Sequence, residues 1–184
     1  MSRLSVVDPA QATGEVGSTL AAIDAQLGVT PNLFKVAANS AATLNALVQL
    51  TGALGKGHLN ARVREAIALS VAELNGCDYC LSAHTFLGKA AGLSESDVAL
   101  ARNGDGPEAR TKAIVGLAAA IVGSRGHVGT GALAQARAAG VTDAEITEVV
   151  GNVALNVFTN YLNGVAETEI DFPVVRAAVP ATHA

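Results

Sequence analysis

Apolar residues recur every three to four positions along most of the chain, and no stretch alternates apolar with polar residues as a strand would. In one segment Val63, Ile67, Val71 and Leu74 fall on a single face of a helix that Asn60 can cap. The pattern predicts an all-α fold.

Cap and breaker residues divide the chain into successive helices. A capping box is expected where Thr142 precedes Glu145, and Ser94 with Asp97 opens an earlier helix in the same way. Thr30 is expected to cap a helix whose first turn holds Pro31. The other predicted helices span 18–27, 40–55, 60–74, 77–91, 108–123, 130–139 and 143–164.

The helical pattern repeats within the chain. The segment 66–76 resembles 113–123, which lies 47 residues later, and 89–94 resembles 137–142, which lies 48 residues later. This self-similarity predicts an internal helical repeat, with a core motif region at 60–102 and a degenerate second copy at 107–164. An irregular tail at 165–184, marked by Pro173 and Pro180, completes a single domain.

Composition adds an expectation about assembly. The chain has 184 residues, half of them hydrophobic but only 3% aromatic, so small side chains let its helices approach closely. So many apolar residues in a short chain indicate that some helix faces are buried between subunits. We expect a homo-oligomer, a trimer or a hexamer.

Charge and hydropathy exclude several classes of partner. The net charge is −4 and the chain has no basic cluster, so neither nucleic acid nor an anionic membrane is expected as a partner. The first residues lack the apolar stretch of a secretory signal, and the longest apolar runs are short or broken by asparagines. A soluble, cytoplasmic protein is expected.

The candidate chemistry lies in one cluster. The only two cysteines, Cys77 and Cys80, are three residues apart, and His84 follows four residues later. On a helix these positions share one face. Two thiols and an imidazole on one face indicate either a dithiol redox centre with its own base or three of the ligands of a metal site.

Gly76 breaks the chain just before Cys77, which places the pair near a helix N-terminus. Unsatisfied amides and the helix dipole favour a thiolate there. Cys80 is within reach of His84, so we expect Cys80 to be the attacking thiolate and Cys77 the partner that closes the disulfide. A helix end also allows the Cα separation that a disulfide needs.

A further base is required to move protons through the pair. Glu65 and Glu73 are the nearby carboxylates, and Glu73 is closer in sequence but is expected to be solvent-exposed at the end of its helix. The Asn75-Gly76 break lets the two helices fold back on each other and bring Glu65 near. Spacing does not choose between the two glutamates.

These residues resemble a known family. Arg62, the Glu65-Ala-Ile-Ala-Leu run and Asn75-Gly-Cys-x-Tyr-Cys, followed by His84, are similar to the core of the alkylhydroperoxidase AhpD and carboxymuconolactone decarboxylase superfamily. The segment 30–34 and the sequence Phe158-x-Asn160-Tyr161 resemble its peroxidase-related branch.

The resemblance implies an AhpD-like helical bundle and a thiol-dependent peroxidase that needs no cofactor or metal. Cys80 would attack the hydroperoxide and become a sulfenic acid, and Cys77 would condense with it to a disulfide. His84 would orient and deprotonate, and Glu65 would act as general base on Cys77. A thiol reductant such as a dihydrolipoyl protein would reopen the disulfide.

One position departs from the pattern. AhpD itself has a second histidine just before the second cysteine, where this chain has Tyr79. A phenol is a poor base at neutral pH but can donate a hydrogen bond. Tyr79 could orient the peroxide or simply pack.

Several alternatives remain open at this stage. The cluster could bind zinc with Glu65 or water as a further ligand, although no second ligand pair exists. The domain could be a decarboxylase-like lyase, a non-catalytic redox sensor, or a bundle with an inert cysteine pair. Three other histidines, His58, His127 and His183, are isolated and expected to be ordinary surface or packing residues.

Overall fold

The computed structural model describes residues 2–178, and within them the chain forms nine helices and no strand. This confirms the predicted all-α fold. The helices are α1 (Gly14–Leu27), α2 (Asn32–Ala37), α3 (Ala41–Leu54), α4 (Ala61–Leu74), α5 (Asp78–Ala90), α6 (Glu95–Arg102), α7 (Ala109–Ser124), α8 (Thr130–Ala138) and α9 (Asp143–Ala166).

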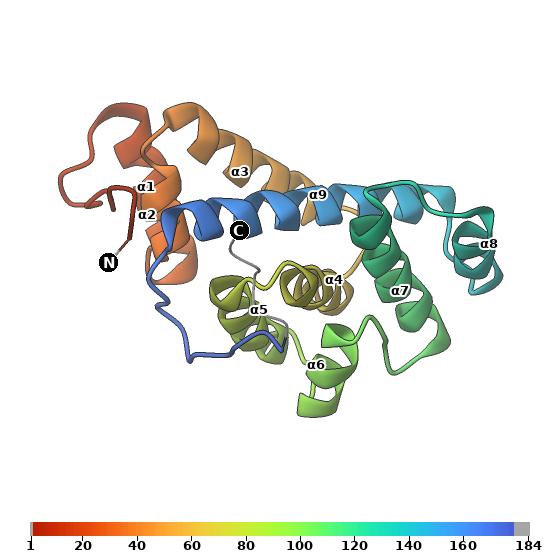
Figure 1. Cartoon of the computed structure of the whole chain (residues 1–184). Coiled ribbons are helices and arrows are strands. Elements are labelled where there is room, and N and C mark those ends of the chain that lie inside the picture. The colour runs from red at the N-terminus through yellow and green to blue at the C-terminus, as the bar shows by residue number, and fades with distance from the viewer. Residues whose placement is uncertain (1, 179–184) are drawn as a thin grey trace.

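Helix α4 lies at the centre of the bundle and contacts α5, α6, α7 and α9. Eight consecutive residues, from Ala66 to Glu73, are buried, so all faces of its second half are covered. The long helix α9 lies across α3, α4 and α7 (Figure 1). The buried side chains are mostly Leu, Val, Ile and Ala, as expected for a chain with few aromatics.

Three helices begin at the predicted caps. Asn60 accepts a hydrogen bond from the Val63 amide, and complete capping boxes form at Ser94 with Asp97 and at Thr142 with Glu145. These side chains satisfy amides that the first turn leaves free.

Two predicted helix starts are wrong. Helix α1 begins at Gly14 rather than at residue 18, and its first turn carries Glu15, whose charge suits a helix N-terminus. Pro31 is the N-cap of α2 rather than its first helical residue. Thr30 does not cap this helix because its hydroxyl donates to Asp24 Oδ1 at 3.3 Å.

Each of the two similar segments contains the same kind of contact, at positions that differ by 48 residues. Arg62 contacts Asp97 of the first capping box, and Arg110 contacts Glu145 of the second. The preceding turns contain Gly92 at φ 95° and Gly140 at φ 78°, a conformation that favours glycine. The internal repeat is therefore visible in hydrogen bonds as well as in sequence.

Residues 169–178, here called the C-terminal segment, run from the end of α9 and pass below α5 (Figure 1). Ser82 Oγ accepts a hydrogen bond from the Val175 amide at 2.9 Å, and Asp78 accepts from Arg176 Nη1 at 2.6 Å and from the Ala177 amide at 2.8 Å. The predicted irregular tail is thus fixed against α5 up to residue 178. Pro180 and His183 lie outside the described residues.

Candidate active site

The cysteine pair follows a sharp turn between two helices. Gly76 has φ 65°, and the amides of Gly76 and Cys77 donate back to the carbonyls of Glu73 and Ala72, which closes the end of α4. Cys77 is the N-cap of α5, and its Sγ accepts a hydrogen bond from the Cys80 amide at 3.3 Å. The predicted helix break is confirmed, and it folds α5 back along α4.

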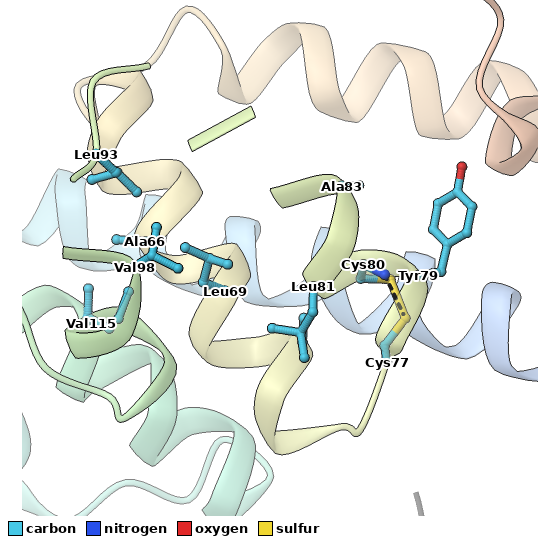
Figure 2. Packing of buried hydrophobic residues seen from close by; sticks show 12 residues of the cluster. Ala66, Leu69, Cys77, Tyr79, Cys80, Leu81, Ala83, Leu93, Val98 and Val115 are labelled. Atoms are coloured by element: carbon cyan, nitrogen blue, oxygen red, sulfur yellow. Dashed lines mark hydrogen bonds between the residues drawn. A yellow bond between two sulfur atoms is a disulfide. The ribbon is translucent and has the colours of Figure 1, made fainter. Parts of the chain in front are cut away.

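Cys77 and Cys80 form a disulfide with a Cα separation of 5.3 Å. This separation lies within the usual range for disulfides, so the pair closes without unfolding the first turn of α5. Figure 2 shows both sulfurs at the start of α5, with the Tyr79 ring pointing away from Cys77. Cys77 is 8% exposed and Cys80 is 2% exposed, so little of either sulfur reaches solvent.

His84 and Glu65 form the polar pair of the site. His84 Nδ1 lies 2.8 Å from Glu65 Oε2, and both side chains are about four-fifths buried. His84 lies one turn after Cys80, and Glu65 reaches it from the first half of α4. Glu65 thus bonds to His84 rather than to Cys77. Because Nδ1 of His84 is engaged, Nε2 is the ring nitrogen that can exchange protons.

Glu73 was predicted to be solvent-exposed, but it is buried. Its Oε2 accepts from Arg102 Nε at 2.7 Å and its Oε1 accepts from the Ala178 amide at 2.7 Å. Helix α6 and the C-terminal segment cover the end of α4, which the sequence of α4 alone does not reveal. Glu73 therefore anchors the C-terminal segment.

Tyr79 is engaged in packing. Its hydroxyl accepts a hydrogen bond from the Leu33 amide at 3.0 Å, and its ring meets Phe172 edge-on at 5.9 Å. Burial raises the pKa of Tyr79, and the nearby Asp171 carboxylate raises it further. The neutral phenol holds α2 and the C-terminal segment against α5.

A cavity of about 320 Å³ opens beside the pair. Cys80, His84 and Glu65 line one side of it, whereas Cys77 does not line it. The remaining lining is mostly apolar: Leu27, Val29, Pro31, Leu33, Phe34, Leu47, Leu54, Ala68, Tyr79, Ala83, Phe86, Leu87, Leu155 and Phe172, with Thr51 and Arg64. The two sulfurs therefore face different surroundings.

Helix α9 adds polar side chains that the sequence analysis missed. Asn152, Asn156, Thr159 and Asn163 are buried and line the cavity. Asn163 Nδ2 lies 3.4 Å from Cys80 Sγ. They recur every three or four residues along α9, and this spacing is a sequence signal for a polar stripe that faces inward.

The described residues, 2–178, contain no group of three or more His, Cys, Asp or Glu side chains placed to hold a metal ion. His58 is exposed and lies 4.0 Å from Glu148, and His127 lies in the turn between α7 and α8. No helix among these residues is long and apolar enough to cross a membrane.

One known family matches part of the chain. Residues 41–107 match the Carboxymuconolactone decarboxylase family, and this region holds Glu65, both cysteines and His84. Over these residues the chain resembles that family, as the motif around Cys77 and Cys80 predicted. A search of curated proteins gives no significant match.

Solved structures share the AhpD-like fold over nearly the whole chain. The AhpD core of a peroxidase-related protein from Ralstonia eutropha JMP134 has a TM-score of 0.83 at 19% identity, covering 92% of both chains. A peroxidase-related protein from Silicibacter sp. TM1040 has a TM-score of 0.80 at 22% identity, covering 91% of this chain and 89% of that one.

A third similar structure is a cysteine-to-alanine variant of the debrominase Bmp8 in complex with 2,3,4-tribromopyrrole. Its TM-score is 0.77 at 18% identity, covering 93% of this chain and 94% of that one. At these identities the likeness of all three structures concerns the fold.

Proposed function

We propose that the protein is a thiol-dependent hydroperoxide reductase that uses Cys77 and Cys80 as a redox-active pair. The observation that carries the proposal is the placement of Cys80 at a helix N-terminus, facing a mostly apolar cavity, one turn from a histidine that a glutamate holds. These are the features that lower a thiol pKa and supply a proton to a leaving group.

The reaction begins from the reduced pair. The Cys80 thiolate attacks the terminal oxygen of the hydroperoxide, the O–O bond breaks, and the alkoxide takes a proton from His84 to leave as an alcohol. Cys80 becomes a sulfenic acid. Glu65 stabilises the protonated imidazole through Nδ1.

The second step closes the disulfide. The Cys77 sulfur attacks the Cys80 sulfenic acid and expels hydroxide, which leaves as water after taking up the proton of the Cys77 thiol. One hydroperoxide and two thiols thus give one alcohol, one water and one disulfide. An external dithiol, which the superfamily resemblance suggests is a dihydrolipoyl protein, returns the pair to the reduced state.

The same proposal includes a cytoplasmic homo-oligomer, a trimer or a hexamer. Val29, Phe86, Tyr161 and Val165 are each more than half exposed on the single chain, which supports burial of apolar surface between subunits. Sedimentation equilibrium measures the subunit number, and a monomer at all concentrations contradicts this part of the proposal.

Reductive dehalogenation is the second candidate. The size and apolar lining of the cavity suit a small halogenated ring, and the debrominase Bmp8 shares the fold. This reaction also consumes both thiols. Replacement of one C–Br bond by C–H oxidises two thiols to a disulfide and releases HBr.

The test is a thiol count and intact mass on the reduced protein, before and after one equivalent of cumene hydroperoxide. Wild type should lose both thiols and two hydrogen masses, and Cys77→Ser should gain one oxygen mass at Cys80. Cys80→Ser should keep its remaining thiol. If the wild-type thiols survive, the peroxidase proposal is wrong, and bromide release from a bromopyrrole then tests the second candidate.

A further inference from the structure

Asn163 differs from the other asparagines that line the cavity. Asn152 and Asn156 each donate an amide hydrogen to a carbonyl of their own helix, at 2.8 Å. Asn163 instead donates to Cys80 Sγ on α5, at 3.4 Å. It is 4% exposed, and its Oδ1 is buried without a hydrogen-bond partner among residues 2–178.

A buried carbonyl oxygen without a donor costs free energy, so such a group in a binding cavity indicates a ligand that brings the donor. The lining around Asn163 is mostly apolar and offers few competing donors. The donor must therefore come from the reacting end of the ligand, next to Cys80.

We infer that Asn163 binds both reacting groups: Nδ2 holds the Cys80 sulfur, and Oδ1 accepts the terminal O–H of an apolar organic hydroperoxide. This inference rests on the proposed peroxidase function. It adds a substrate-positioning residue outside the Glu65, Cys77, Cys80 and His84 set, and it names the substrate class.

The chemistry is consistent with the roles of both amide atoms. A thiolate is only an acceptor, so it needs the N–H side of the amide. The terminal peroxide oxygen, which the thiolate attacks, carries the hydrogen that Oδ1 can accept. One planar amide thus places the nucleophile beside the atom it attacks, and positioning of this kind lowers the barrier.

The apolar lining decides between organic and inorganic peroxide. Hydrogen peroxide would leave most of a cavity of about 320 Å³ unfilled, whereas an aryl or alkyl group buries apolar surface there. We therefore expect cumene hydroperoxide to react faster than hydrogen peroxide.

The test uses Cys77→Ser as background, because Cys80 is then the only thiol in the chain. The first measurement is the pH profile of alkylation by iodoacetamide, which reports the thiol without any peroxide. The second is the rate of oxygen addition from cumene hydroperoxide, followed by intact mass.

Asn163→Leu should move the alkylation midpoint up by about one pH unit or more and slow oxygen addition by about 10- to 100-fold, because a hydrogen bond to a charged group is lost. Asn163→Asp keeps the shape and the acceptor but loses the donor. It should raise the alkylation midpoint as well, and it remains informative if the leucine variant does not fold.

Asn160→Leu is the matched control, since Asn160 is equally buried on α9 but does not line the cavity. It should lower the thermal unfolding temperature without moving the alkylation midpoint. If both Asn163 variants fold and behave as the background in both measurements, the inference is wrong and the peroxidase proposal stands. If the Cys77→Ser background does not react with peroxide, both the proposed function and the role of Asn163 in binding the ligand are wrong. The alkylation profile then tests only whether Asn163 contacts Cys80.

Discussion

Glu65 and Glu73 lie on the same helix, yet their carboxylates contact different neighbours. Glu65 binds His84 beside the cavity, whereas Glu73 binds Arg102 and the Ala178 amide. One carboxylate can take part in proton transfer and the other holds the fold, so the two can be separated by experiment.

We expect Glu65→Gln to slow the reaction of Cys80 with cumene hydroperoxide by about tenfold or more, because a neutral amide stabilises a protonated imidazole less than a carboxylate does. Its thermal unfolding temperature should stay near that of wild type. Rapid-mixing measurements of thiol loss give the rate.

Glu73→Gln is the matched comparison. It should lower the free energy of unfolding by about 1–3 kcal/mol, because a buried charge-assisted hydrogen bond is weakened, and leave the rate with peroxide nearly unchanged. The opposite result, a slow reaction in Glu73→Gln and a normal one in Glu65→Gln, would assign the base to Glu73.

At the residue scale the sequence predicted only part of the site. The positions of Cys77, Cys80 and His84 follow from helical spacing, because Cys77 caps α5 and the other two lie on it. Asn163 lies 83 residues after Cys80, and the contact depends on how α9 crosses α5, which no local pattern encodes. The choice of Glu65 needed the family resemblance for the same reason.

Among the helices, the two capping boxes are the clearest link between sequence and stability. Hydrogen bonds from the Arg110 side chain and then from the Thr142 backbone lower the pKa of Glu145 from 4.5 to about 2. A carboxylate whose pKa is lower in the folded state stabilises that state at pH values above its pKa in the unfolded chain. This stabilisation is lost as the pH falls through its pKa in the folded state.

Glu145→Gln should therefore lower the free energy of unfolding by about 1–2 kcal/mol at pH 7. The difference from wild type should shrink as the pH falls from 4.5 toward about 2. Urea unfolding at a series of pH values measures it, with the exposed Asp143→Asn as control. A constant difference across this pH range would argue against the ion pair.

Helix ends were predictable where a side chain caps them, as at Asn60, Ser94 and Thr142. The two misplaced helix starts are among those that no side chain caps. The start of α1 at Gly14 and the N-cap of α2 at Pro31 have no side-chain cap hydrogen bond, so the sequence there carries no comparable signal.

Across the whole molecule, the C-terminal segment connects α5 to the end of α4. Ile170, Phe172, Val175 and Ala177 pack against the core cluster that contains Cys77, and the segment is tied to Ser82 and Asp78 of α5. Proline positions predicted an irregular tail, but a segment without periodicity gives no sign of where it packs.

The double variant Ser82→Ala with Arg176→Ala should loosen this segment. We expect dithiothreitol to reduce the Cys77–Cys80 disulfide several-fold faster, because local opening becomes less costly. Quenched alkylation and mass measure the rate, and Arg3→Ala, which breaks an exposed ion pair with Glu167, is the control. Equal reduction rates in the double variant and wild type would show that the segment does not limit access.

The separation of the two sulfurs has a consequence for the order of events in turnover. Both cysteines lie in the core cluster that the C-terminal segment covers, but only Cys80 also lines the cavity. A dithiol that reaches Cys77 from that side forms a mixed disulfide with it and expels Cys80 as a thiolate. The peroxide-reactive sulfur would then be restored, facing a vacant cavity, while the electron donor is still covalently attached. A second hydroperoxide could bind in the cavity before the dithiol has departed, so the two substrates would reach the cysteine pair by separate routes.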